Sequence, residues 1–304
     1  MNTDKETKCG LVALLGAPNA GKSTLVNALT GEDIAVVTHK AQTTRTPLRG
    51  IFQENGSQVI LIDTPGILRP RTSLEKAMMH AAWGSVTEAD AVLLIVDAAR
   101  REAVQEIPNL LQRVQNEAAP NIPIILVLNK VDRVTKPRLL TLAEEAKDYA
   151  PFESIFMISA ETGDGVQDLR RKLAHIVPAG PHLFGEDEIT DTPMRLLAAE
   201  MTRGHILRQL HEEIPYGCAV ETESWVAGTE KQKCAIHQVI YVLRESHKRM
   251  MIGSGGSRIK AIGQAARQDI EAMTGEPVHL KLFVKVKPDW PESPHQYAVW
   301  NTER

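Results

Sequence analysis

Apolar residues in the first half of the chain follow two alternating patterns. Short, continuous apolar runs are typical of buried strands, and they occur at residues 10–15, 58–62, 90–97, 122–128 and 155–158. Helical spacing of apolar residues separates these runs, at residues 24–29, 74–88, 103–115, 139–149 and 166–176. This alternation of strands and helices predicts an α/β fold with a doubly wound, mostly parallel sheet.

The pattern changes after residue 177. Residues 178–188 contain two prolines, two glycines and a cluster of acids, which predicts a linker. A helix at 194 to about 213, strands at 218–226 and 233–243, a turn at 227–230, a helix at 259–273 and a strand at 278–286 follow. We therefore predict a first domain at 8–178, a linker at 179–192, an α+β domain at 193–288 and a C-terminal extension at 289–304.

The first strand leads into a loop that fits a phosphate-binding motif, Gly16-Ala17-Pro18-Asn19-Ala20-Gly21-Lys22-Ser23. Successive backbone N–H groups and the N-terminus of the next helix can face phosphate oxygens there. Lys22 is expected to reach the β- and γ-phosphates, and the Ser23 hydroxyl to ligate Mg²⁺. The residues expected to contact a nucleotide in this segment are Asn19, Ala20, Gly21, Lys22, Ser23 and Thr24.

Three later motifs, each at a predicted strand end, favour guanine nucleotides. Asp63-Thr64-Pro65-Gly66 offers a carboxylate for Mg²⁺ and a Gly66 N–H for the γ-phosphate. Asn129-Lys130-Val131-Asp132 offers a carboxylate for two guanine donors that adenine lacks, with Asn129 tied to the phosphate loop and Lys130 covering the base. Ser159-Ala160 can meet guanine O6 through its backbone.

Composition narrows the class of protein. The net charge of −3 excludes a polycation, so any nucleic-acid site must be local. The three cysteines are scattered and lack metal or disulfide spacing, which favours reduced thiols in a cytoplasm. The first eight residues resemble neither an export signal nor a transit peptide. The longest apolar runs are strand-length, so no membrane span is expected.

The second half carries a basic stretch around Gly253-x-x-Gly256, between two predicted helical segments in an αββααβ order, which has the form of a KH nucleic-acid loop. Five basic residues lie between 244 and 260 against one acid, Glu245. Met251, Ile252, Ile259 and Ile262 are expected to line the groove floor. A packing corner between two helices is the alternative. The residues predicted to bind RNA are Lys248, Arg249, Ile252, Gly253, Ser254, Gly255, Gly256, Arg258, Ile259 and Lys260.

Together these motifs, with Lys40 to Arg45, Glu188-Ile-Thr-Asp191, Glu213-Ile-Pro-Tyr216 and the stretch 251–263, resemble the Era family of bacterial ribosome-assembly GTPases. The resemblance implies a P-loop GTPase domain followed by a type II KH domain. It implies that 42–45 is switch I, with Thr44 on Mg²⁺ in the GTP state. It also implies binding to the 3′ end of 16S ribosomal RNA, timing of 30S subunit maturation, and a cytoplasmic monomer loosely associated with the inner membrane.

Small departures from the family concern Ala17, Thr46 and the uncharged Ser254-Gly255. The last affects details of RNA contact. A further feature bears on catalysis: Ile67 stands where many GTPases place a water-orienting glutamine. We therefore hypothesise that hydrolysis depends on Lys22, Thr44, Gly66 and Mg²⁺, with K⁺ held near Asn19. The alternative is that Asn19 only caps the loop.

Two other functions stay open from the residues alone: a tRNA-modification-type GTPase and a non-hydrolysing RNA chaperone. The first lacks a further catalytic constellation in 189–304, and the second is disfavoured by the intact nucleotide motifs. The ten histidines show no ligand spacing, and we expect His205 and His211 on an exposed helix face. We expect Trp225, Trp290 and Trp300 in the core or rim of the second domain, and a loosely packed tail at 288–304.

Overall fold

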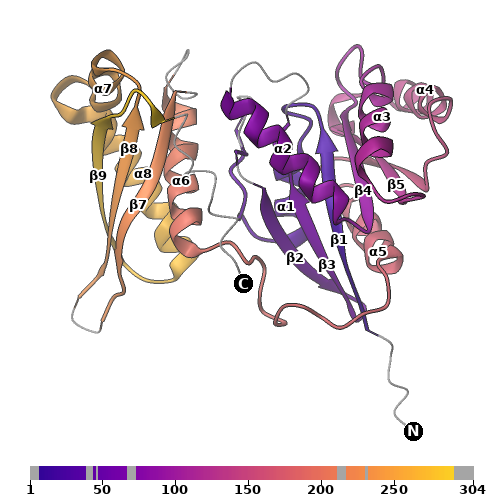
Figure 1. The fold of residues 1–304 in the computed structure, drawn as a ribbon, viewed down its shortest axis with the longest axis horizontal. Coiled ribbons are helices and arrows are strands. Elements are labelled where there is room, and N and C mark those ends of the chain that lie inside the picture. The colour runs from indigo at the N-terminus through magenta and orange to yellow at the C-terminus, as the bar shows by residue number, and fades with distance from the viewer. Residues whose placement is uncertain are drawn as a thin grey trace, which may run out of the picture. The chain divides into compact units, whose positions relative to one another are not determined.

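The computed structural model describes residues 7–38, 44–45, 47–66, 73–210, 217–229 and 232–290. The chain forms two compact units, residues 1–191 and 192–304 (Figure 1). Predictions that concern residues 40–43, Thr46, Ile67, 211–216 and Trp300 lie outside the described residues.

The first unit contains a six-stranded sheet with the order β2-β3-β1-β4-β5-β6. All neighbouring pairs are parallel except β2 and β3, which confirms the mostly parallel α/β fold. Its strands are β1 (Lys8–Gly16), β2 (Leu48–Glu54), β3 (Ser57–Asp63), β4 (Ala91–Asp97), β5 (Ile124–Asn129) and β6 (Ser154–Ile158). Its helices are α1 (Lys22–Thr30), α2 (Ser73–Thr87), α3 (Ile107–Glu117), α4 (Lys136–Lys147) and α5 (Val166–Ile176), with the short 3-10 helix η1 (Val131–Arg133).

The predicted apolar runs form the centre of this unit. Side chains of β1, β4 and β5 pack with those of α3 and α4 in one buried cluster, and α1 packs against α5. Every residue of β3 is buried. The parallel strands therefore bring their carboxyl ends, and the motifs that follow them, to one edge of the sheet.

Strand β2 was not predicted. It joins β3 through Asn55 and Gly56, which both adopt left-handed φ angles of 53° and 83°. Two such residues form the tight turn that suits a β-hairpin. Leu48, Ile51 and Phe52 are buried in this strand. The Asn-Gly pair between two apolar stretches was the available sequence signal.

The predicted linker lies along the first unit. The Cys9 N–H donates to the Pro178 carbonyl oxygen at 3.0 Å, and the Ile51 N–H donates to the Ile189 carbonyl oxygen at 2.7 Å. Arg49 and Asp191 form an ion pair at 2.9 Å. Composition predicted the irregular structure of this segment, but its hydrogen bonds to β1 and β2 could not be read from composition.

The second unit has the predicted order of elements. It contains α6 (Met194–Gln209), β7 (Cys218–Val226), β8 (Cys234–Val242), α7 (Glu245–Ile252), the 3-10 helix η2 (Ser254–Gly256), α8 (Ser257–Thr274) and β9 (Val278–Val286). The sheet order is β7-β8-β9, with β7 antiparallel and β9 parallel to β8. This α+β unit follows the α/β unit, as expected.

Three predictions about single residues of this unit were wrong. Met251 and Ile262 are fully buried in its core and do not line an open groove. His205 is not on an exposed face, because its Nε2 lies 2.7 Å from Oδ2 of Asp269 on α8 and its side chain is 12% exposed. The burial of Trp290 confirms its predicted place in the core, and its indole N–H donates to the Gly217 carbonyl oxygen. The start of the predicted loose tail is therefore packed.

The length and polarity of the helices decide whether any of them could cross a membrane. Within the described ranges, every helix is too short or too polar to cross a bilayer.

Candidate nucleotide-binding and RNA-binding sites

The loop between β1 and α1 needs its glycines for steric reasons. A Cβ on Gly16 would lie 2.3 Å from the Ile95 carbonyl oxygen. At Gly21, φ is 99° and a Cβ would lie 2.1 Å from Nδ2 of Asn129. Asn19 also adopts a left-handed φ of 62°. The loop is therefore held in a curved conformation that side chains at Gly16 and Gly21 would prevent.

Lys22 is buried beneath this loop, with 5% of its surface exposed. Its Nζ donates to the carbonyl oxygens of Gly16 and Ala17, both at 3.0 Å. Burial lowers the pKa of Lys22 to about 8, while the charge of Asp63 opposes this shift. The ammonium thus lies in the loop where an anion would stabilise its charged form.

Three predicted Mg²⁺ ligands lie together beside Lys22. Oδ2 of Asp63 accepts hydrogen bonds from Ser23 Oγ at 2.7 Å and from Thr44 Oγ1 at 2.8 Å, and the two hydroxyl oxygens are 3.0 Å apart. Burial raises the pKa of Asp63, opposed by Lys22 and by the two hydroxyls. Asp63 Oδ1 is buried and has no partner among the described residues. A carboxylate and two hydroxyls form a donor set that suits Mg²⁺.

The segment after β3 packs closely on the phosphate loop. A Cβ on Gly66 would lie 2.6 Å from Lys22 Nζ and 2.9 Å from backbone atoms of Pro18. The Thr64 hydroxyl donates to the Leu14 carbonyl oxygen at 2.5 Å. Gly66 therefore brings its backbone against the loop in a way that no other residue could.

The Asn129 side chain joins three segments at the same edge of the sheet. Its Nδ2 donates to the Ala20 carbonyl oxygen at 2.8 Å, and its Oδ1 accepts from the Ala160 N–H at 3.0 Å. The predicted tie between Asn129 and the phosphate loop is thus confirmed. Ala20 and Ala160 are both buried, and Thr24 lies partly exposed in the first turn of α1.

Lys130 and Asp132 lie beside this junction. Lys130 has a left-handed φ of 67°, and its Nζ donates to the Asn19 carbonyl oxygen and to Asp97 Oδ2, both at 2.7 Å. The Ser159 hydroxyl lowers the pKa of Asp132, and Arg133 lies 3.4 Å away. Asp97 was missed by sequence reasoning, although a polar residue directly after a buried run was a usable signal.

The loop between α7 and α8 holds most of the predicted RNA-binding residues. Gly253, Gly255 and Gly256 adopt left-handed φ angles of 76°, 56° and 78°. A Cβ on Gly253 would lie 2.8 Å from the Arg258 Cβ. Ser254 and Gly255 are exposed, as are Arg249, Arg258 and Lys260, whereas Lys248, Ile252 and Ile259 are half-buried. The loop therefore presents backbone and cations together at the start of α8.

Comparisons with known proteins agree with this two-part organisation. A family model described as 50S ribosome-binding GTPase matches residues 11–130, and a KH domain model matches residues 213–291. GTPase Era of Brucella suis biovar 1 is 49% identical over 297 residues, which cover 96% of this chain and 92% of the relative. GTPase Era of Bradyrhizobium diazoefficiens is 48% identical, with 98% and 95% covered.

Solved structures give the same answer. A crystal structure of Era in complex with MgGDPNP and nucleotides 1506–1542 of 16S ribosomal RNA is 37% identical, with a TM-score of 0.89. It is matched over 96% of this chain and 97% of that chain. A variant of Aquifex aeolicus Era bound to GDP and aluminium fluoride has a TM-score of 0.87, with 96% and 98% covered.

Proposed function

The chain belongs to the Era GTPase family, and from that premise we propose that it is a switch that binds the 3′ end of 16S ribosomal RNA and times 30S subunit maturation. The convergence of Ser23, Thr44 and Asp63 beside Lys22 carries this proposal. Thr44 precedes β2, and Gly66 follows β3, so two separate segments meet where a γ-phosphate would bind. Both can respond to its presence.

The nucleotide pocket is assigned in two parts. Residues 19–24 surround the phosphates, with Lys22 as the cation that neutralises charge on them. Asn129, Lys130, Asp132, Ser159 and Ala160 form the guanine side. An ionised Asp132 accepts hydrogen bonds from guanine donors, and the Ser159 hydroxyl favours this ionised form by lowering the pKa of Asp132.

Ser23, Thr44 and Asp63 would hold Mg²⁺ in this pocket. The metal would supply positive charge to the phosphate oxygens. The chain's own contribution is to gather one carboxylate and two hydroxyls within 2.7–3.0 Å of one another. Lys22 and the Gly66 backbone then position the reacting phosphate.

We propose that K⁺ bound near Asn19 assists hydrolysis. Asn19 has a left-handed backbone and its carbonyl oxygen accepts from Lys130. A monovalent cation beside the phosphates would neutralise developing charge as an arginine finger does. GTP turnover should therefore be faster in K⁺ than in Na⁺ at equal ionic strength. Equal rates in the two salts would remove K⁺ from the mechanism.

The second unit is assigned to RNA. The three left-handed glycines allow the backbone of the α7–α8 loop to approach a sugar-phosphate chain, and Arg249, Arg258 and Lys260 supply charge. The related Era structure was solved with a segment of 16S ribosomal RNA, which supports the same ligand for this chain. Family analogy also supports a cytoplasmic monomer with peripheral association with the inner membrane.

Crosslinking to total RNA tests the whole proposal. The full chain is loaded with a non-hydrolysable GTP analogue or with GDP, irradiated with RNA, and the bound sequences are read. We expect the 3′ end of 16S ribosomal RNA to be enriched in the GTP-like state. Equal recovery from both states would contradict the switch, and a preference for adenine nucleotides would contradict the pocket assignment.

A further inference from the structure

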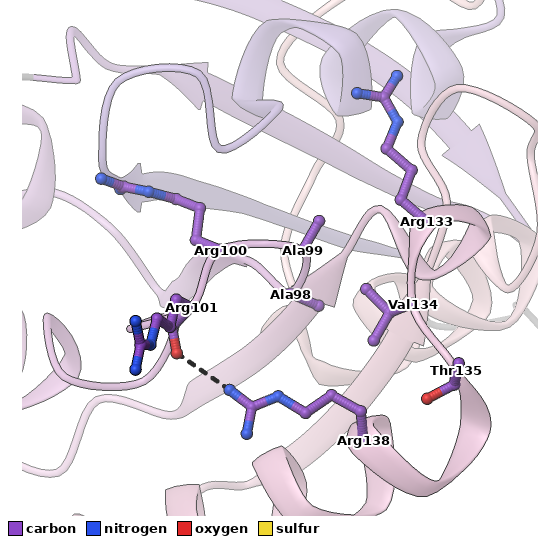
Figure 2. A pocket seen from close by; sticks show the side chains of 8 residues that line it. All are labelled: Ala98, Ala99, Arg100, Arg101, Arg133, Val134, Thr135 and Arg138. Carbon is purple, nitrogen blue, oxygen red and sulfur yellow. Dashed lines mark hydrogen bonds between the residues drawn. The ribbon is translucent and has the colours of Figure 1, made fainter.

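A cavity of about 490 Å³ lies in the first unit, beside the connections that follow β4 and β5 (Figure 2). Residues 98–101 form one side of it, and residues 133–135 with Arg138 form the other. None of the residues assigned above to the nucleotide or to the α7–α8 loop lines it. The cavity is therefore distinct from these two sites, although Arg133 in its lining also lies 3.4 Å from Asp132.

The lining of this cavity is strongly basic. Four of its eight residues are arginines (Arg100, Arg101, Arg133 and Arg138), and none of the described lining residues is acidic. Guanidinium groups remain charged at any physiological pH, and several of them around one cavity repel one another unless an anion is present. The cavity thus concentrates positive charge within a chain whose net charge is −3.

The four arginines fall into two pairs. Arg100 and Arg133 are neutralised by Glu106 at 3.1 Å and Glu161 at 2.7 Å. Figure 2 shows Arg133 pointing away from Arg138. Arg138 donates to the Arg101 carbonyl oxygen at 3.1 Å. Within the part of the chain that the structure describes, no carboxylate pairs with Arg101 or Arg138.

The backbone around Arg138 adds to this charge. Thr135 lines the cavity and precedes α4, and its side chain makes no cap hydrogen bond. The first N–H group of α4 that donates to a backbone carbonyl is that of Leu139, and its acceptor is the Thr135 carbonyl oxygen. The N–H groups of Lys136 and Arg138 therefore have no partner within the helix, and the helix dipole is positive here.

We propose that this cavity binds a phosphate group, carried either by an RNA chain or by a small free phosphate compound. Arg101 and Arg138 are its main ligands, because a planar guanidinium pairs with phosphate oxygens through two parallel hydrogen bonds. The Thr135 hydroxyl supplies a further donor. Val134 and Ala98 form an apolar part of the wall.

The test uses the full chain loaded with GDP, so that the nucleotide pocket is filled. The variant carries Arg101→Gln and Arg138→Gln. A matched control carries Arg171→Gln and Lys147→Gln, which remove two exposed cations of the same unit that pair with Asp168 and Glu144. Unchanged GTP turnover and circular dichroism establish that both proteins are folded.

Two probes distinguish the sources of phosphate. Calorimetric titration with inorganic pyrophosphate measures the free compound, and fluorescence anisotropy with a mixed-sequence single-stranded RNA measures the chain at several salt concentrations. If RNA is the source, the slope of log affinity against log salt falls by about 0.7 in the variant, since the one lost phosphate contributes about 0.7 for a single strand. If free phosphate is the source, pyrophosphate binding weakens by at least about tenfold.

Either change, absent from the control, supports the proposal and names the source. An unchanged salt slope together with unchanged or undetectable pyrophosphate binding overturns it. The α7–α8 loop does not enter this comparison, because it is identical in the variant and the control. Failure of the cavity proposal therefore leaves the function proposed for that loop unaffected.

Discussion

Two buried ionisable side chains, Lys22 and Asp63, determine the electrostatics of the phosphate end of the nucleotide pocket. Burial disfavours the charged form of each, so it lowers the pKa of Lys22 and raises that of Asp63, while each charge stabilises the other. Burying both charged groups without a ligand is unfavourable to the stability of the folded protein. A phosphate and a divalent cation would relieve that cost, so the pocket is arranged for ligands and not for stability.

Nucleotide affinity should therefore depend on pH through Lys22. Its pKa of about 8 in the free protein means that binding above this value must be accompanied by proton uptake, because phosphate favours the ammonium. We expect GDP affinity to be flat below about pH 7 and to fall by up to about tenfold per unit above pH 8. Calorimetry in two buffers of different ionisation enthalpy measures the proton taken up.

The same pKa shift also predicts how the stability of the nucleotide-free protein changes with pH. The folded chain binds fewer protons at Lys22 than the unfolded chain between pH 8 and the ordinary value of 10.5. The cost of burying the charge is present below that window and is relieved within it, so this group makes stability rise with pH there. GDP binding without proton uptake at pH 8 to 9 would contradict both predictions, because the pKa of Lys22 would then not lie near 8.

Strand ends were the most predictable features of the chain. Asp63, Asn129 and Ser159 each follow a continuous apolar run, and parallel strands bring such residues to one edge of a sheet. Sequence reasoning could therefore predict that Asn129 would reach the phosphate loop. Asp97 also ends an apolar run and could have been assigned to this edge of the sheet. Its partner could not be predicted, because Lys130 lies 33 positions later and reaches Asp97 from a left-handed backbone position.

Interactions between elements account for the other misses. His205 has a helical position compatible with either exposure or burial, and only the packing of α6 on α8 brings Asp269 to it. Met251 and Ile262 are apolar and adjacent to basic residues, which is compatible with both a groove and a core. Strand β2 depends on pairing with β3, whereas its own residues, with Gly50 and Gln53 among them, give a weak pattern.

Helix α6 contains a buried ion pair that should be sensitive to a single substitution. The Arg203 side chain is 2% exposed, and its Nε donates to the Glu200 carboxylate at 2.8 and 3.0 Å. Glu200→Gln removes the compensating charge from a buried guanidinium, which should cost about 3 kcal/mol of stability in the second unit. Urea unfolding followed by tryptophan fluorescence measures it, with the transition of the second unit, which contains Trp225 and Trp290, separated from that of the first, which contains Trp83.

The control for this substitution is Glu245→Gln, at an exposed position of α7 in the same unit. It should change the free energy of unfolding by no more than about 0.5 kcal/mol. GTP turnover should be unaffected in both variants, since no residue of α6 belongs to the nucleotide pocket. A Glu200→Gln protein as stable as the parent would mean that Arg203 is compensated by its other contacts.

The chain as a whole separates two kinds of charge. The nucleotide pocket surrounds one buried lysine with backbone and hydroxyl donors, whereas the α7–α8 loop exposes its cations to solvent. Because the net charge is −3, long-range attraction to RNA is weak and binding must depend on these local cations. A substitution in one compact unit should therefore be able to remove RNA binding or GTP turnover without affecting the other.

Gly253→Asp tests that independence. Gly253 has a φ of 76°, and a Cβ there would lie 2.8 Å from the Arg258 Cβ and 3.0 Å from its backbone nitrogen. The substitution thus strains the loop and also places a carboxylate where RNA phosphate is expected. We expect RNA crosslinking to fall to background while GTP turnover stays within about twofold, since the nucleotide pocket lies wholly in the first unit.

Gly275→Asp is the matched control, because Gly275 at the other end of α8 has a φ of 70° and open space around it. It adds the same charge to the same unit and should leave crosslinking in place. Loss of both activities in Gly253→Asp would show that the two units depend on each other.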